Sequence, residues 1–458
     1  MYLSKARFQN LSLSLALSTG VIPAALHAQE KTDTAHEKLD TTKLTEDEAK
    51  EPGYKPKIEV SGYGEIIYKY SDFGPNQRAS TRGSKRDQRV DLDMTRFAIE
   101  LEAELARGFK LEAELEIEHG GTGSAVDLEY EEGGEYENDV EKGGEVAFEN
   151  LFLEKSLGNH RLRIGKFPVA LGLLPDHHDP LDFLGAVRPE SESHIIPNNW
   201  SEIGIDYAYK TPLNTYALQL VNGLDSTGFS SQEFIVGGFQ QKFMSSKATD
   251  PAFVARWSTR LIPGLDTGFS LYYGETSRNR PQSDLVKKCA SSSVNADAVN
   301  NVAPCPYVKA PVTLIAWEAA GEWDKIRLLA SALQGKIKNA AEINARNANL
   351  STKYVGILRS AVAERAYAAW AEAGYSFVGY ESDDRITPFV RYEQYDTIDK
   401  PAPGQADVDR FDRRVWTLGA DYQFAKSVII KIDTARRTFV SKNLRAEDEV
   451  RINTSFMF

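Results

Sequence analysis

The chain has 458 residues, of which 26% are charged and 41% hydrophobic, and its formal net charge at pH 7 is −12. Its mean hydropathy is −0.41, and after residue 30 no apolar run approaches the roughly 20 residues that a membrane-spanning helix needs, which argues against a helical membrane protein. The negative charge also disfavours nucleic-acid binding. A transmembrane barrel stays open, because its strands alternate apolar and polar residues and average to a soluble-looking composition.

Residues 1–28 are predicted to be a secretory signal peptide. Lys5 and Arg7 give it a positive start, and residues 11–22 supply an apolar segment interrupted by serines. Small residues before position 29 favour cleavage after about Ala28. The alternative, an uncleaved anchor helix, needs a longer and cleaner apolar run.

Residues 29–55 are polar and have no periodicity, so we expect a flexible lead-in. From Lys57 onward the dominant period is two, which predicts a single domain of strands over residues 56–458. The clearest hairpin spans residues 96–118, where apolar residues alternate with carboxylates on both sides of a turn at 106–108. As strands, these segments have one apolar and one charged face. A soluble sheet with one wet face would give the same local pattern.

Repetition of this pattern along the chain favours the barrel. About sixteen alternating segments are predicted, at 57–70, 96–105, 109–118, 145–156, 160–167, 201–211, 215–222, 252–262, 266–274, 311–323, 325–335, 363–378, 385–396, 413–424, 427–440 and 449–458. Short turns alternate with long connections near 71–89, 119–144, 168–200, 223–250, 275–310, 336–362, 397–412 and 441–448. The predicted fold is therefore all-β: a transmembrane antiparallel β-barrel of about 16 strands, with short periplasmic turns and long extracellular loops.

The chain ends on an alternating segment whose last residue is Phe458. This ending resembles the C-terminal signature that outer-membrane barrels present to their assembly machinery. The resemblance implies a protein of the Gram-negative outer membrane that contacts lipid and lipopolysaccharide. Aromatic pairs at the predicted strand ends suit the two membrane–water boundaries.

Cys289 and Cys305 lie in one polar stretch rich in Ser, Asn and Pro. In an exported chain this spacing predicts a local disulfide, whose closure is worth roughly 3 kcal/mol on the chain-entropy model. A metal site is the alternative, but residues 280–310 contain no His and no further Cys. No cofactor is expected.

A barrel of about sixteen strands is too wide for side chains to fill, so we expect a water-filled channel. The basic residues expected to line it are Arg161, Arg163, Lys166, Arg256, Arg327, Arg391 and Arg437. The acidic residues expected to line it are Glu100, Glu102, Glu112, Glu114 and Glu116. Opposed walls of this kind would create a transverse field that favours small dipolar or charged solutes. The alternative is that many of these charges pair across neighbouring strands.

The connection over residues 168–200 is unusually apolar for an exposed loop, so we expect it to fold inward and form a constriction. Its candidate polar residues are His177, His178, Asp179, Arg188 and His194. An ordinary extracellular loop is the alternative. A metal site at 177–179 is disfavoured, because adjacent residues usually point apart whereas a divalent ion needs three or four converging ligands.

The segments ENLFLEKSLGNHRLRIGKFPVALGLL and HHDPLDFLGAVRPESESHIIPNNWSEIGIDYAY resemble the middle of the phosphate-selective porin O/P-like family, and the pattern extends over roughly residues 57–225. The resemblance implies a sixteen-stranded barrel, usually a homotrimer, that admits solutes passively. We expect general diffusion of small hydrophilic solutes or ions. Phosphate or anion selectivity is the first alternative, cation preference a second, and an adhesin or structural barrel with a plugged lumen a third. An enzyme is not expected, because no Ser-His-carboxylate pattern falls at predicted strand ends.

Overall fold

The computed structural model describes residues 56–75, 86–121, 127–129, 137–139, 144–173, 177–240, 246–279, 308–348, 360–378, 384–424, 427–441 and 443–458. The predicted signal peptide, most of the lead-in and the predicted Cys289–Cys305 disulfide lie outside these residues. Among the described residues, no helix is long and apolar enough to cross a membrane.

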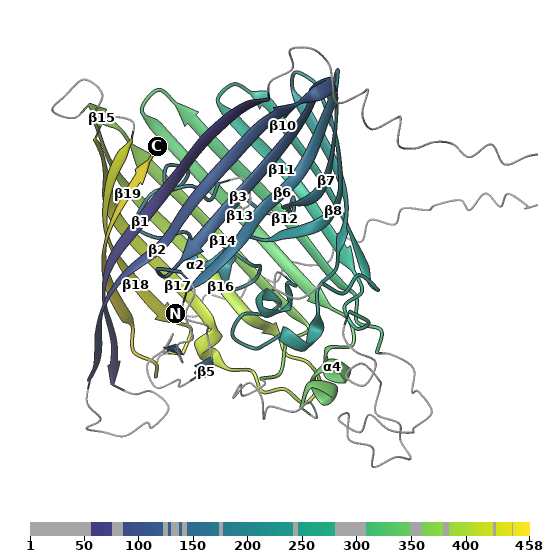
Figure 1. Ribbon diagram of the computed structural model, residues 1–458. Coiled ribbons are helices and arrows are strands. Elements are labelled where there is room, and N and C mark those ends of the chain that lie inside the picture. The colour runs from purple at the N-terminus through teal and green to yellow at the C-terminus, as the bar shows by residue number, and fades with distance from the viewer. Residues whose placement is uncertain are drawn as a thin grey trace, which may run out of the picture. The chain divides into compact units, whose positions relative to one another are not determined.

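The described strands form one antiparallel sheet that closes into a sixteen-stranded barrel (Figure 1). The wall consists of β1 (Lys57–Pro75), β2 (Arg86–Leu105), β3 (Phe109–Glu118), β6 (Glu145–Leu157), β7 (His160–Pro168), β8 (Ser201–Lys210), β9 (Asn214–Asn222), β10 (Pro251–Ile262), β11 (Leu265–Gly274), β12 (Val312–Trp323), β13 (Ile326–Ile337), β14 (Arg365–Tyr375), β15 (Phe377–Val378), β16 (Arg385–Lys400), β17 (Asp412–Phe424), β18 (Val428–Phe439) and β19 (Glu447–Met457). Strands β14 and β15 both pair with β16 and occupy one place in the wall. Each strand pairs with the next in the chain, and β19 returns to β1.

Short elements occupy the connections. They are η1 (Ala106–Gly108), β4 (Asp127–Glu129) and β5 (Glu137–Asp139), which pair with each other, α2 (Glu190–Ser193), η3 (Ser226–Gly228), η4 (Val236–Gly238), α4 (Ala340–Asn347) and η5 (Asp409–Phe411). Helix α4 and residues 223–240 pack with wall residues in one apolar cluster that includes Leu224, Phe234 and Ile343. This cluster places folded segments against the inner wall.

The predicted fold class is confirmed, and the predicted segments coincide with the sixteen wall positions. One predicted connection was too long: residues 71–89 were expected to form a loop, but β1 continues to Pro75 and β2 begins at Arg86. The prediction relied on apolar residues alternating with polar ones, and the extension is polar. Its side chains form their own ion pairs instead, such as Arg89 with Asp87 at 2.7 Å. The predicted loop 119–144 likewise contains the β4–β5 pair.

The two faces of the wall differ in polarity, as β8 shows. Its outward side chains Ile203, Ile205 and Tyr207 are 58%, 47% and 38% exposed, whereas the inward Glu202 and Asp206 are 3% and 1% exposed. An apolar exterior around a polar interior is the reverse of a soluble sheet packed on its core. It is the arrangement that hydrocarbon outside and water inside favour.

The seam between β1 and β19 closes the barrel. The backbones of Gly62 and Phe458 exchange two hydrogen bonds, of 3.1 and 3.0 Å. The Phe458 ring covers Gly62 and stacks on Phe97 with ring centroids 6.1 Å apart. The Phe456 ring covers Gly64, where an added Cβ would lie 2.4 Å from a ring carbon. The two glycines thus provide the space that the last two aromatic rings occupy.

Candidate functional site

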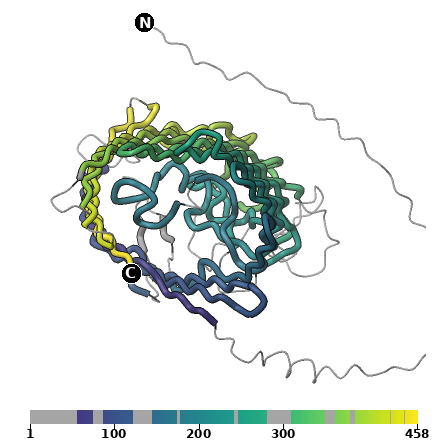
Figure 2. Tube along the Cα trace, turned by 90° about the horizontal axis from the view of Figure 1, so that it is seen from above, coloured from purple at the N-terminus to yellow at the C-terminus, as the bar shows by residue number. Residues whose placement is uncertain are grey.

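The connection from β7 to β8, residues 168–200, lies inside the ring of strands when the barrel is viewed along its axis (Figure 2). We call its described residues the inward loop. Its apolar side chains are buried, with Leu171, Ile195 and Ile196 each 0% exposed. Burial of such side chains favours the inward position over a fully solvated one.

Two glycines and one buried glutamate shape the inward loop. Gly172 and Gly185 have φ of 75° and 81°, in the left-handed region that disfavours residues with a Cβ. The buried carboxylate of Glu192 accepts the backbone N–H of Leu173 at 3.1 Å and the indole N–H of Trp370 at 2.8 Å. Glu192 therefore ties two parts of the loop to each other and to β14.

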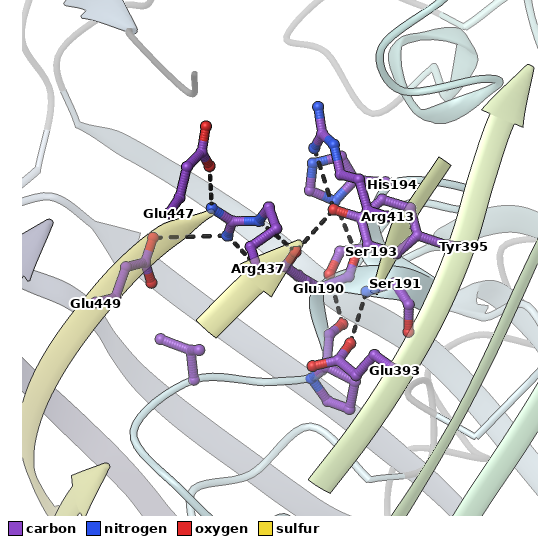
Figure 3. Close-up of polar contacts among 12 residues, drawn as sticks. Glu190, Ser191, Ser193, His194, Glu393, Tyr395, Arg413, Arg437, Glu447 and Glu449 are labelled. Carbon is purple, nitrogen blue, oxygen red and sulfur yellow. Dashed lines mark hydrogen bonds and ion pairs between the residues drawn. The ribbon is translucent and has the colours of Figure 1, made fainter. Parts of the chain in front are cut away.

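Helix α2 of the inward loop is fixed to the wall by a buried ion cluster (Figure 3). Arg437 on β18 donates to Glu190 at 2.8 Å and to Glu447 on β19 at 2.7 Å. Tyr395 on β16 also donates to Glu190, at 2.7 Å. Burial alone would raise the pKa of Glu190, but the charge and hydrogen bond of Arg437 outweigh it and hold this pKa well below its ordinary value. Glu190 is therefore a carboxylate at neutral pH.

Two further contacts belong to the same cluster. The backbone N–H of Ser191 donates to Glu393 on β16 at 2.8 Å, and the ring of His194 lies 5.1 Å from that of Tyr395. Two residues singled out from the sequence therefore belong to this ion cluster: Arg437, expected to line the channel, and His194, expected in the constriction.

The other side of the inward loop contacts β2 and β3. Arg96 donates to the backbone oxygen of His178 at 2.9 Å, and His178 Nε2 lies 3.8 Å from Glu114 Oε1. Burial would lower the pKa of His178, but the hydrogen bond and charge of Glu114 raise it. Burial raises the pKa of Asp179 to about 6, with Asp182 adding to the effect and His178 opposing it.

Arg188 anchors the same side of the loop. Its guanidinium donates to Asn199 at 2.5 Å, and Asn199 donates to Glu116 on β3 at 2.9 Å. Burial, together with the charge of Arg96, lowers the pKa of Arg188 from its ordinary value. The loop is therefore held to β2 and β3 as well as to β14, β16 and β18.

A cavity of about 960 Å³ lies between the inward loop and strands β7 to β13. Four of the expected basic residues line it together: Arg161, Arg163, Arg256 and Arg327. His177 of the inward loop is a further lining residue. The cavity also reaches the short turns at Pro212 and Pro263, so it lies toward the short-turn end of the barrel.

The guanidinium groups that line this cavity are paired with carboxylates or donate hydrogen bonds to carbonyl oxygens of the inward loop. Arg161 lies 2.7 Å from Asp206, Arg163 lies 2.8 Å from Glu154, and Arg256 lies 2.5 Å from Glu318. Arg327 donates to the backbone oxygens of Leu181, at 2.7 Å, and Asp182. The expected basic wall is therefore largely neutralised by its neighbours.

The expected acidic residues share one face of β2 and β3, where Glu100 lies opposite Glu114 and Glu102 opposite Glu112. Like charges in direct opposition destabilise a sheet, and nearby cations offset this. Lys110 pairs with Glu102 and lies 3.7 Å from Glu112.

The same face is covered unequally. Glu114 and Glu116 are 4% and 1% exposed beneath the inward loop. Glu100 is only partly buried and accepts a hydrogen bond from Ser61 at 2.9 Å. Only part of the acidic face therefore borders open space.

Two basic residues that were expected to line the channel, Lys166 and Arg391, do not border the open cavity. Lys166 pairs in register with Leu151 and Ile203, which are exposed on the outward face, so it does not share a face with Arg163. The reason is the strand period of two, since Lys166 lies three positions after Arg163 and an odd offset changes the face. Arg391 faces inward but is 0% exposed and paired with Glu372 at 2.5 Å.

Sequence reasoning missed the wall residues that hold the loop, including Glu372, Asp421, Lys431 and Asp433. Their inward position on predicted strands was an available signal, but nothing in one sequence says which segment covers them. Among the described residues, no group of three or more His, Cys, Asp or Glu could hold a metal ion.

No family model matches the sequence. An uncharacterized protein of Aquifex aeolicus (strain VF5) is 23% identical over 411 residues, which cover 88% of this chain and 80% of that protein. The outer membrane channel DcaP of Acinetobacter baumannii matches with a TM-score of 0.50 and 11% identity over 88% of this chain and 97% of that one. An anion-selective porin from Comamonas acidovorans matches with a TM-score of 0.48 and 11% identity, covering 88% and 100% of the two chains. The likeness to DcaP concerns the barrel fold, and membership of the phosphate-selective porin O/P-like family stays a prediction.

Proposed function

We propose that this chain is an outer-membrane porin through which small hydrophilic solutes or ions diffuse passively. The observation that carries the proposal is the closed sixteen-stranded barrel, apolar outside and polar inside, with a cavity of about 960 Å³ beside its inward loop. A barrel of this width encloses more space than its own side chains fill. Export after cleavage near Ala28, insertion guided by Phe458, contact with lipopolysaccharide and assembly as a homotrimer belong to the same proposal.

The charges of the cavity favour general diffusion with a modest preference for anions. Six cations line the cavity, namely Arg161, Arg163, Lys210, Arg256, Arg260 and Arg327, against four lining carboxylates, Asp206, Asp266, Glu318 and Glu322. With Glu154, the partner of Arg163, the excess is one positive charge. Phosphate selection needs guanidinium groups that offer their donors to phosphate oxygens. Here each of the four guanidinium groups already contacts a carboxylate or a loop carbonyl through at least one of its donors, which leaves fewer donors for a phosphate. Strong phosphate selectivity is thus the weaker proposal.

Single-channel recording in planar bilayers tests the proposal. We expect the purified, refolded barrel to produce stepwise conductance, and reversal potentials in a KCl gradient to show weak anion preference. A barrel that inserts but conducts nothing would instead favour an adhesin or structural protein with a plugged lumen. Replacing chloride by phosphate at equal charge separates general diffusion from phosphate selection, because only a selective pore would retain its current with the larger anion.

A further inference from the structure

A group of basic residues lies where strands β12 to β14 meet their long connections. We call it the basic corner, and its members are Lys309, Lys336, Lys338 and Arg365. The three lysines are exposed, and 42% of the surface of the Arg365 side chain is exposed. Helix α4, which follows β13 directly, marks this end of the wall in Figure 1.

Backbone contacts bring the members of the basic corner together from separate strands. Lys336 and Arg365 lie directly opposite each other in the register of β13 and β14. The side chain of Asn339, the residue after Lys338, donates to the backbone oxygen of Lys309 at 2.8 Å. The connection that precedes β12 and the one that follows β13 therefore place their lysines at the same corner.

The two opposed cations, Lys336 and Arg365, lie on the outward face of the wall. Along β13, Lys336 alternates with buried residues and shares its face with Leu328, which is 40% exposed. Along β14, Arg365 shares its face with Tyr375, which is 43% exposed, and not with the buried Trp370. This is the face that a transmembrane barrel turns toward lipid.

Cations outnumber carboxylates at the basic corner. Among the described residues, β16 contributes two carboxylates beside it, Asp396 and Asp399, and Asp399 pairs with Arg365. Lys400 and Glu364 pair with each other and add no net charge. Four cations against these two carboxylates leave an excess of two positive charges. Like charges directly opposite each other destabilise a sheet, so an anion held between the two opposed cations would stabilise this part of the wall.

Nearer the middle of the wall, the outward face of β13 and β14 consists of small side chains. We call them the alanine strip: Ala330, Ala332, Ala369, Ala371 and Ala373. Bulkier outward side chains flank the strip, namely Trp317 on β12 and Val390 and Tyr392 on β16. Because a methyl group extends less far from the sheet than these side chains do, hydrocarbon chains have room to lie along the strip beneath the charges.

We propose that the basic corner binds a phosphate group of lipopolysaccharide and that acyl chains of the same molecule pack along the alanine strip. Lysine and arginine side chains at a membrane surface attract anionic headgroups, and a guanidinium group can hold phosphate oxygens bidentately. A phosphorylated lipid matches both the charge of the corner and the apolar strip that continues from it. This inference rests on the proposed function, which places the long connections at the outer leaflet.

Titration of the refolded barrel in detergent with lipid A, the phosphorylated anchor of lipopolysaccharide, tests the site, and native mass spectrometry counts the bound lipid. The double variant Lys336→Gln with Lys338→Gln removes two charges and leaves the pair of Arg365 and Asp399 intact. We expect it to weaken binding roughly thirtyfold, because each cation near an anionic lipid contributes about fivefold. The control, Lys247→Gln with Arg414→Gln, removes two exposed cations from other long-connection ends and should bind like the wild type.

The lipid is distinguished from free phosphate by two further titrations. Lipid A from which the phosphates have been removed should bind the wild type about as weakly as intact lipid A binds the double variant. Inorganic phosphate at the concentration that saturates the site with lipid A should displace none of the lipid, because it has no hydrocarbon to place on the strip. Equal binding of the two forms of lipid A, or displacement by inorganic phosphate, would contradict the proposal.

The alanine strip is tested without any change of charge. Ala332→Leu adds bulk opposite Ala369 and should weaken binding of lipid A roughly fourfold, as expected when about one methylene group loses its contact. Ala255→Leu, at an outward position of β10 between Phe253 and Trp257, is the control and should leave binding unchanged. Equal affinities of the two variants would show that the acyl chains do not use the strip.

Electrophoretic resistance to unfolding in cold detergent verifies that each variant barrel is intact. A wild type that binds no lipid A, or an intact Lys336→Gln/Lys338→Gln barrel with unchanged affinity, overturns the lipid site. A variant that loses an oligomeric mass and keeps its lipid also overturns it, since the face would then contact a second copy of the chain. Conductance is recorded separately: a barrel that conducts and binds no lipid A loses only this inference, whereas one that binds lipid A and never conducts loses only the proposed function.

Discussion

His178 and Asp179 respond to pH in the same direction at the place where the inward loop meets β3. The pKa of His178 is raised, so its stabilising contribution is complete below its ordinary pKa and is lost as pH rises through the raised value. The pKa of the Asp179 carboxyl is raised to about 6, so its protonated form is favoured in the folded state and the benefit is lost as pH rises through that value. Rising pH therefore weakens this anchor.

We expect the open-channel current to become noisier as pH rises from about 5 to about 8, because the segment around His178 then moves more. Single-channel recordings at constant salt measure this noise. The double variant His178→Gln with Asp179→Asn, in which neither side chain titrates in this range, should flatten most of the dependence. Equal noise at both ends of the range in the wild type would show that this contact does not control loop motion.

Strands β1 and β19 meet through complementary shapes as well as backbone hydrogen bonds. Gly64 lies opposite Phe456 in the register, and its missing side chain leaves room for the ring. The backbone at Gly64 is ordinary extended strand, so space and not conformational freedom makes glycine necessary there. The same relation holds between Gly62 and Phe458.

We predict that Gly64→Ala and Phe456→Ala each destabilise the barrel by about 2 kcal/mol, the first by overpacking and the second by loss of the packing of the ring over Gly64. The double variant should lose less than the sum, because the added methyl group enters the space that the ring vacates. Urea titrations of folding into lipid vesicles measure these free energies of unfolding. Phe253→Ala, which removes an outward ring 43% exposed on β10, is the control. Strict additivity would contradict the complementary seam.

Charges inside the whole barrel are arranged as neighbouring pairs more than as opposed walls. Arg161 and Asp206, on adjacent strands, lie 2.7 Å apart, and Asp206 is 1% exposed. Their fields largely cancel for a solute a few ångströms away, so the channel as a whole should discriminate weakly.

We predict opposite selectivity changes from the two halves of this pair. Arg161→Gln should shift the reversal potential toward cations, and Asp206→Asn should shift it toward anions. The double variant should return close to the wild-type value, since it removes a pair of zero net charge. Reversal potentials in KCl gradients report all three, and an unaltered value in both single variants would mean that the pair does not face the permeation path.

The barrel was predictable from the sequence because apolar and polar residues alternate with a period of two within each strand. The apolar residues of the inward loop likewise indicated burial before any partner was known. The partners themselves were not predictable, since Leu184 and Glu372 are 188 positions apart and Ala186 and Asn453 are 267 apart. Lys166 was grouped with Arg163 by charge, although strict alternation places them on opposite faces.

The wall contacts of the inward loop also constrain the order in which the molecule can form. Residues 183–187 of the loop precede β8, whereas the side chains that bond to them lie on strands β14 and β16 to β19, namely Glu372, Arg391, Asp421, Lys431, Asp433 and Asn453. A nascent chain consequently carries an apolar loop whose destination has not yet been synthesised or inserted. The loop can take its final position only after the last strands have joined the wall, so a barrel stopped before that step would have one open edge and a loop without these wall contacts.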